Sequence, residues 1–361
     1  MTVTSTVTPL SPGSPGANEP LDAHPVTALR ARQRRRLGVV VVTGLVLTVA
    51  LATLALTLGA ASLPPGRALL ALFGLGNDTD VFVVQRLRLP RIEAAVLAGA
   101  AFGLAGALFQ TTLRNPLASP DILGIASGAS LGAVFGLLAL GVTGLAVSAA
   151  AFAGAAAVAL LIWFFAWRRG LHSIRFVLVG VGFAYLCSSL LSWLLARAGE
   201  REAQSALLWT VGSVADVRGT ELVVLATGLA VIGVVIAATA RWQGPLALGD
   251  DHARALGVHT DLARVGSLLL AVALVALATS FAGPLAFVAL VAPAIARRLL
   301  DDGGAALLAS TVTGAALVLA ADVVGQHALF GISVPAGIVT GLVGAPYLLW
   351  LLAMNERKSR P

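Results

Sequence analysis

The residues of this 361-residue chain that could do chemistry are few and scattered. A metal site needs several ligands together, and of the five histidines only His252 and His259 could share a helix face, so we expect no metal site. The sequence has no HExxH motif and no Ser–His or Cys–His pair at matching depth, which argues against an enzyme. The only lysine, Lys358, does not end a GxxxxGK(S/T) phosphate-binding loop, so we expect no cofactor and no ATP hydrolysis on this chain.

One short charged run, residues 249–257, reads GDDHARALG and is bounded by glycines. Acidic residues at a helix start and a glycine at its end both favour a helix, so we expect a short surface helix here. It would present Ala253 and Leu256 on one side. We predict that the run docks a partner protein, and a solvated loop helix is the alternative. Its candidate residues are Gly249, Asp250, Asp251, Ala253, Arg254, Leu256 and Gly257.

A second group of charges lies at the ends of apolar segments. Arg88, Pro90 and Arg91 precede a long apolar run. Proline is tolerated in the first turn of a helix and arginine can reach water from a helix end, so we expect these residues to fix the entry of a helix. Asp322 is a carboxylate near the end of another apolar run, where an ionisable group is a functional candidate. The alternative is a structural role, in which the Asp322 carboxylate is solvated or hydrogen-bonded to the backbone.

A polar elbow, RNPLASPD at residues 114–121, follows the first of these runs. Asn115 is expected to hold the turn before Pro116, and Asp121 to cap the next helix, with contact to a partner as the alternative.

Later in the chain, Pro284 fits the first turn of a helix and Pro293 should break or kink that helix about halfway. A broken helix is tolerated in a membrane where protein or a water cavity surrounds it, which suggests a transport path. Three serines in another apolar run, Ser188, Ser189 and Ser192, could line such a path, although packing between helices would explain them equally well.

Composition requires these residues to sit among membrane-spanning helices. Charged residues make up 11% of the chain, against ~25% in soluble domains. Apolar runs of about 20 residues, the length that crosses a bilayer, predict an all-α polytopic membrane protein with ten transmembrane helices. The predicted spans are 38–60, 90–110, 120–141, 144–167, 172–196, 220–240, 262–282, 284–299, 305–325 and 335–353, of which 284–299 is too short to be expected to cross fully.

Ten spans put both termini on one side, and most of the 24 Lys and Arg residues then fall in loops on that side. Basic residues collect in cytoplasmic loops, so both termini are predicted to be cytoplasmic, in the cytoplasmic membrane. We expect a disordered basic tail at 1–37, the permeation domain at 38–353 and a cytoplasmic tail at 354–361. The net charge of +7 is explained by these loops rather than by binding of nucleic acid.

On the outer side, Arg67 and Arg86 are candidates for docking an extracytoplasmic protein. Single exposed ion pairs contribute only ~0–1 kcal/mol, so this docking would depend on several charges.

Several motifs occur in a fixed order along the chain. They are RLPR at 88–91, Gln110, RNPLASPDILG at 114–124, SGAS at 127–130, Trp209 with Gly212-Ser213, LGDDHARALGV at 248–258, AGPLAFVALVAPAIARRL at 282–299, Ala321-Asp322 and VPAGIVTGLVGAPYLLWLL at 334–352. With these motifs, roughly residues 38–353 resemble the permease subunits of iron-siderophore and cobalamin ABC importers, the FecCD type.

The resemblance implies the ten-helix type II ABC importer permease fold in a bacterial cytoplasmic membrane. It also implies partners: a second permease subunit, two cytoplasmic ATPase subunits that hold ATP and Mg²⁺, and an extracytoplasmic substrate-binding protein. Residues 249–257 would then be the helix that couples to the ATPase, and a ferric siderophore would be the substrate.

Two departures from the family pattern bear on whether the permease pairs with a copy of itself or with a different permease subunit. Ala294 stands where a histidine is common, and Ile332-Ser333-Val334 precede Pro335 where a polar or acidic residue is common. With Tyr347–Trp350, they resemble the ferric-catecholate type and favour a heterodimer over a homodimer.

Other function classes remain as alternatives. One is a cobalamin or haem importer permease of the same family. The other is a proton-driven secondary transporter, which would usually place an ionisable group near the midplane, whereas Glu93 and Asp322 lie near span ends.

Overall fold

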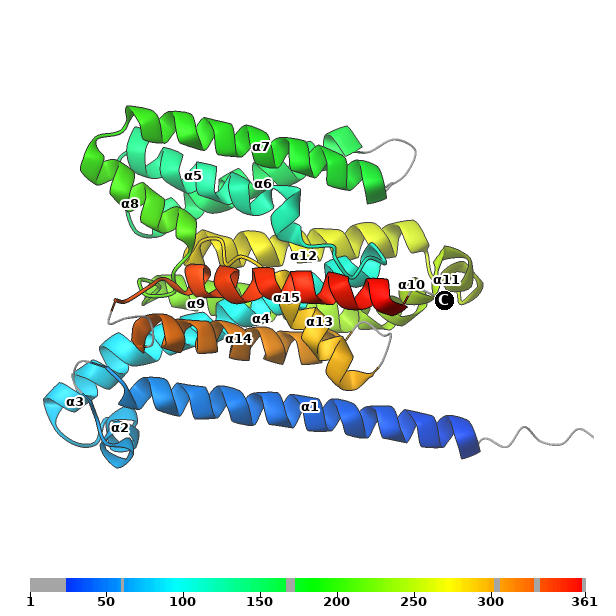
Figure 1. The fold of residues 1–361 in the computed structure, drawn as a ribbon, viewed down its shortest axis with the longest axis horizontal. Helices are drawn as coiled ribbons and strands as arrows, with labels where there is room; N and C mark the ends of the chain where they lie inside the picture. The colour runs from blue at the N-terminus through cyan, green and yellow to red at the C-terminus, as the bar shows by residue number, and fades with distance from the viewer. Residues whose placement is uncertain (1–23, 60–61, 167–172, 302–305, 328–331, 359–361) are drawn as a thin grey trace, which may run out of the picture.

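The computed structural model is an all-helical bundle, with no strand in the described ranges 24–59, 62–166, 173–301, 306–327 and 332–358 (Figure 1). The helices of the first half are α1 (His24–Thr57), α2 (Pro65–Leu72), α3 (Asp78–Phe82), α4 (Leu89–Thr112), α5 (Ile125–Ala139), α6 (Leu145–Ala166), α7 (Ser173–Arg197) and α8 (Glu200–Val211). Those of the second half are α9 (Thr220–Thr239), α10 (Gln243–Leu248), α11 (Asp250–Ala255), α12 (Thr260–Ala282), α13 (Val288–Leu300), α14 (Leu307–His327) and α15 (Ala336–Lys358). Short turns of other helix types, Val83–Arg88, Pro120–Leu123 and Ala240–Trp242, precede α4, α5 and α10.

Each of the ten predicted spans corresponds to one helix. These helices are α1, α4, α5, α6, α7, α9, α12, α13, α14 and α15. Seven of them lie in stretches long and apolar enough to cross a membrane, and α5 and the apolar part of α15 are shorter. With 13 residues, α13 is only ~20 Å long against a hydrocarbon core of ~30 Å, so it does not cross alone, as its sequence predicts.

The ends of the chain differ from the predicted tails. α1 begins at His24, so residues 24–37 are helical rather than part of a disordered tail. Arginine, leucine and alanine dominate this stretch and favour helix, which explains the extension. At the other end α15 continues to Lys358. Residues 1–23 and 359–361 lie outside the described residues.

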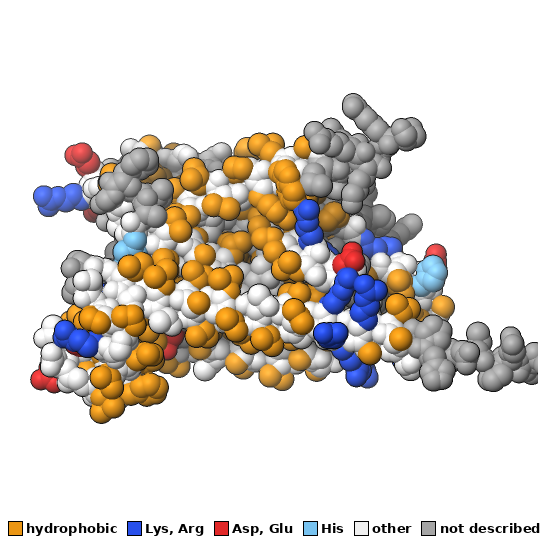
Figure 2. All heavy atoms as spheres, turned by 60° about the horizontal axis from the view of Figure 1, so that its bottom comes forward, with side chains coloured by type: hydrophobic (Ala, Val, Ile, Leu, Met, Phe, Trp, Pro, Cys, Tyr) orange, Lys and Arg blue, Asp and Glu red, His pale blue; other side chains and the backbone are white. Residues whose placement is uncertain are grey.

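The two ends of the bundle carry different short elements. Figure 1 shows α2, α3 and α8 at one end, and α10 and α11 at the other, together with the start of α1 and the end of α15. Figure 2 shows that charged side chains gather towards the two ends and that apolar and uncharged surface lies between them. This distribution matches a multi-pass membrane protein whose chain ends leave the bilayer on the same side.

The core is organised around α4, which is buried along most of its length. It packs against α14 so closely that a Cβ atom at Gly99 or Gly103 would overlap carbonyl oxygens of Gly314 or Ser310. Small residues four apart permit such backbone approach in lipid. Another pair of small residues four apart, Gly180 and Ala184 on α7, lies against the turn before α5, at Leu123 and Gly124.

Candidate functional site

Two interruptions of the helical bundle meet at a polar cavity. One is the irregular stretch between α4 and α5, and the other is the loop 283–287 between α12 and α13. Where they meet, a cavity of about 290 Å³ is lined by residues of both stretches and of α5, α7 and α8. Its polar lining consists of Asp121, Ser127, Ser130, Ser188 and Thr210. One Asp121 carboxylate oxygen, Oδ1, is buried without a hydrogen-bond partner in the described part of the chain.

Only one of the three predicted path serines lines this cavity. Ser188 does so, whereas Ser189 and Ser192 do not, although all three serines are exposed along α7. The Ser192 hydroxyl donates to the Ser188 carbonyl oxygen at 2.9 Å, which is a bond within the helix. Of the three serines, Ser188 is therefore the one that the cavity supports as part of a path.

The elbow between α4 and α5 is held by its own side chains. Asn115 Oδ1 accepts from the Leu117 N–H at 2.9 Å, which is the turn expected before Pro116. Asp121 does not cap a helix as predicted. Ser119 Oγ accepts from the Asp121 N–H at 3.4 Å and caps the turn Pro120–Leu123 instead. The N-cap of α5 is a glycine with positive φ and carries no side-chain cap, because a second turn intervenes that the sequence pattern does not reveal.

The prolines act differently from one another. Pro90 lies at the start of α4, where proline is tolerated. Pro284 is not in a first turn as predicted: it lies in the loop, and α13 begins only at Val288, after the positive-φ residue Phe287. Pro293 does not end the helix either, since α13 continues through it.

The predicted coupling segment forms α10 and α11 at one end of the bundle. Gly249 joins the two helices with φ +111°, a conformation that favours glycine. The acidic pair Asp250 and Asp251 opens α11, as expected from the helix dipole. Leu256 is 63% exposed, but Ala253 is fully buried, so the two residues do not form one exposed face. Leu256 still makes the helical hydrogen bond from its N–H to the His252 carbonyl oxygen at 3.0 Å, so the difference comes from what the neighbouring elements cover and not from a loss of helical register.

Charges from three elements meet at Asp250. Its Oδ1 accepts from Arg114 Nη2 in the elbow at 3.0 Å and from Arg264 Nη2 in α12 at 2.6 Å. A separate exposed pair, Arg254 with Asp251 at 3.2 Å, stays within the coupling segment. Sequence reasoning missed the role of Arg264, because nothing in a chain pattern pairs residues from separate helices.

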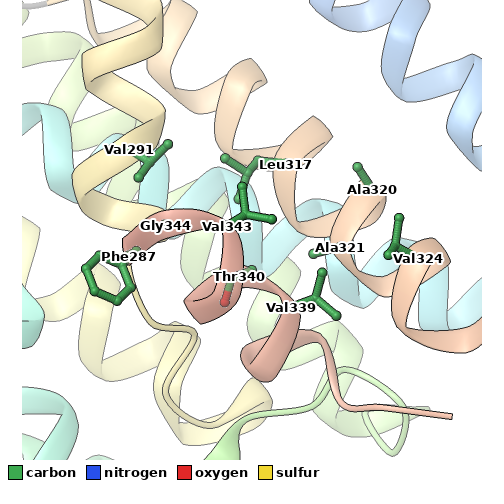
Figure 3. Close-up of a pocket in the computed structure, with 10 residues that line it drawn as sticks. All are labelled: Phe287, Val291, Leu317, Ala320, Ala321, Val324, Val339, Thr340, Val343 and Gly344. Carbon is green, nitrogen blue, oxygen red and sulfur yellow. The ribbon is translucent and has the colours of Figure 1, made fainter. Parts of the chain in front are cut away.

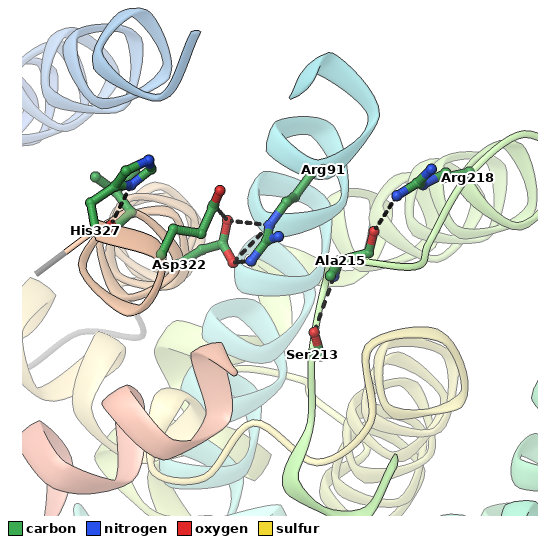
Figure 4. A network of polar contacts seen from close by, with 8 residues as sticks. Arg91, Ser213, Ala215, Arg218, Asp322 and His327 are labelled. Carbon is green, nitrogen blue, oxygen red and sulfur yellow. Dashed lines mark hydrogen bonds and ion pairs between the residues drawn. The ribbon is translucent and has the colours of Figure 1, made fainter. Parts of the chain in front are cut away.

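At the opposite end, Arg91 and Asp322 form a buried ion pair between α4 and α14 (Figure 4). The contact is bidentate: Arg91 Nη2 lies 2.8 Å from Oδ1 of Asp322, and Arg91 Nε lies 2.9 Å from Oδ2. Gln326 also donates to Oδ2 at 2.6 Å. The Arg88 side chain donates to the Leu56 carbonyl oxygen and so ties α4 to the end of α1.

The two predicted docking arginines differ in availability. Arg67 pairs with Asp80, through Nε at 2.9 Å and Nη2 at 2.6 Å, and thereby links α2 to α3. Arg86 is exposed. At the end of the bundle that carries α8, a cavity of about 520 Å³ is lined in part by Asp216 and Glu221, two carboxylates that no sequence pattern groups together.

Another cavity, of about 190 Å³, is apolar and lies between α13, α14 and α15 (Figure 3). Its lining includes Phe287, Leu317 and Val339, and Thr340 is its one hydroxyl-bearing residue. This chemistry suits helix packing or lipid rather than a polar ligand. Among the described residues there is also no group of three or more His, Cys, Asp or Glu side chains that could hold a metal ion.

A family model and two relatives with similar sequences are all of one kind, membrane transport proteins. The FecCD transport family model matches residues 47–354. The ferric enterobactin transport system permease protein FepG of Escherichia coli is 37% identical over 300 residues, which cover 83% of this chain and 91% of that protein. The achromobactin transport system permease protein CbrC of Dickeya dadantii is 39% identical over 311 residues, covering 85% and 89% of the two chains.

A solved structure agrees with these sequence relationships. The chain is similar to one described as a metal-chelate type ABC transporter in an inward-facing conformation, with a TM-score of 0.76 and 25% identity. The likeness covers 88% of this chain and 99% of the other. Family model, sequence relatives and fold therefore all cover most of the ten-helix bundle.

Proposed function

Because this chain belongs to the FecCD transport family, we propose that it is the permease subunit of an ABC importer that moves ferric-siderophore complexes across the cytoplasmic membrane. The family match over residues 47–354 is the observation that carries this proposal. The chain is a transport subunit, and its sequence contains no Walker-type phosphate loop, so ATP hydrolysis is assigned to a partner chain.

The coupling segment, residues 249–257, is the proposed contact with that ATPase. It lies at the end of the bundle where α1 starts and α15 ends (Figure 1). The exposed side chain of Leu256 offers an apolar contact there, and the preceding helix α11 carries acidic and basic side chains. In this orientation both chain termini are cytoplasmic, and α2, α3 and α8 face the outside.

On the outer side, we propose that a substrate-binding protein docks near Arg86. Arg67 is engaged by Asp80, so its part in docking is to support the α2–α3 corner or to exchange Asp80 for a partner carboxylate. Exposed charges of this kind raise the rate of encounter more than the final affinity.

We propose two ATPase subunits and a second permease subunit, with a heterodimer favoured over a homodimer. The support for pairing is that α7 carries few buried residues within this chain and exposes Tyr185, Leu186 and Trp193. The cavity that contains Ser188 adjoins α7, so a path along this helix would be closed by a second subunit.

The substrate would travel inside its chelator, since the polar cavity offers hydroxyls and one carboxylate rather than a ligand set for a bare metal. Iron is therefore cargo and not a cofactor of this chain. A cobalamin or haem importer permease is the alternative within the family, and a proton-driven carrier is not favoured by the family match.

A growth assay distinguishes import of ferric siderophores from import of cobalamin or haem. A strain that lacks this chain should fail to grow under iron limitation on one or more ferric siderophores from a panel, and the intact gene should restore growth. Uptake of the same siderophore should be sensitive to vanadate. Normal growth on every siderophore, together with lost use of cobalamin or haem, would assign the alternative substrate.

A further inference from the structure

The carboxylate of Asp250 connects the coupling segment to two other parts of the bundle at once. Arg114 approaches it from the elbow after α4 and Arg264 from the first turns of α12, both at Oδ1. Arg114 lies 136 positions before Asp250 in the sequence, and Arg264 lies 14 positions after it. One acceptor oxygen thus holds three segments that no continuous helix joins.

The pairing is partly shielded from water. The Arg264 side chain is 14% exposed and that of Asp250 is 28% exposed, whereas Arg114 is 43% exposed. Arg264 Nε is buried without a hydrogen-bond partner in the described part of the chain, so Asp250 is its ionic partner there. A charge held in this way is costly to leave unpaired, so the pair ties α11 to α12.

The backbone at both ends of the contact is unusual. Arg114 adopts φ +51°, which non-glycine residues rarely do and which carries a cost. Opposite it, Gly249 has φ +111°, and a Cβ atom there would lie 3.3 Å from Arg114 Nη1. The elbow and the α10–α11 junction are therefore built to approach each other closely.

We propose that Asp250 is a positioning residue that transmits displacement of the coupling segment jointly to the elbow and to α12. The elbow leads into the turn that carries Asp121, and α12 leads into the loop 283–287, so both routes end at the walls of the polar cavity. ATP-driven movement of α11 thus reaches both walls together. This inference rests on the proposed function.

The test uses the complete complex, purified with its ATPase and second permease and reconstituted in liposomes with its binding protein. The readout is the amount of ferric siderophore transported per ATP hydrolysed. Asp250→Asn and Arg114→Gln should each lower this ratio about two- to fivefold, the range for loss of a partly exposed pair. The double variant should fall no further than the worse single variant, because Asp250→Asn already removes the ion pair that Arg114→Gln breaks. Arg114→Lys should restore much of the ratio.

Arg36→Gln is the matched control. Arg36 makes a long-range ion pair with Asp301 at 3.0 Å at the same end of the bundle, but that pair does not involve the coupling segment. Its loss should leave the ratio unchanged. Additive losses in the double variant, an equal loss with Arg36→Gln, or a complex that merely fails to assemble with Asp250→Asn would each overturn the proposal. A wild-type complex that transports no ferric siderophore would count against the proposed function instead.

Discussion

The buried ion pair between Arg91 and Asp322 should respond asymmetrically to loss of either partner. The Asp322 side chain is only 2% exposed, whereas that of Arg91 is 21% exposed. Arg91→Gln leaves a carboxylate trapped between α4 and α14 with Gln326 as its remaining donor. Asp322→Asn leaves an arginine that can turn towards water at the helix end, beside an amide of nearly the same shape.

The two costs follow from this difference in burial. Removal of one partner from a buried pair costs ~3–5 kcal/mol, and the remaining bond from Gln326 places Arg91→Gln near the lower limit, at about 3 kcal/mol. For Asp322→Asn we expect about 1.5 kcal/mol, which is the loss of a charge-assisted hydrogen bond. In the double variant no buried charge remains, so its cost should be less than the sum of the two.

Unfolding of the purified subunit in mixed micelles, titrated with denaturing detergent, measures these costs. The four proteins of the cycle are compared at one detergent composition, so the coupling is obtained by difference. The reasoning is refuted if Asp322→Asn costs as much as Arg91→Gln, or if the two costs add within error.

Three further predictions concern the other contacts. Gly103→Ala should destabilise the bundle by ~1–3 kcal/mol, because its Cβ would overlap the Ser310 carbonyl oxygen. Gly233→Ala, on α9 with open space around it, is the control and should not destabilise the bundle in the same titration, because alanine favours helix more than glycine does. Leu256→Glu should abolish co-purification of the ATPase without changing the subunit's unfolding, and retained ATPase would remove this residue from the interface. Ser188→Phe should block ferric-siderophore uptake at normal expression by filling the cavity of about 290 Å³, and normal uptake would place the path elsewhere.

The length of the apolar runs was enough to predict the ten helices, because a membrane span must be long and apolar whatever its neighbours are. The sequence also predicts that α13 is too short to cross the membrane, because Arg297 and Arg298 shorten its apolar run. Local turn chemistry was partly readable. Asn115 holds its turn as expected, but the cap comes from Ser119 rather than Asp121, and only three-dimensional packing could decide between two adjacent polar side chains.

The site was harder to predict because it depends on contacts between distant residues. Arg91 and Asp322 were each identified from their place at the end of an apolar run, yet their pairing was not. The grouping of Asp250 with Arg114 and Arg264 had no sequence signal either. Ala253 and Leu256 keep helical spacing, but the neighbouring elements bury Ala253 and leave Leu256 exposed, which spacing alone does not reveal.

Uptake into liposomes tests the central claim most directly. The complete complex is reconstituted with ATP inside and with binding protein and radiolabelled ferric siderophore outside. Our account predicts accumulation that requires ATP, stops with vanadate and persists when a protonophore removes the proton gradient. Accumulation without ATP that a protonophore abolishes would contradict it and would make the chain a proton-driven carrier.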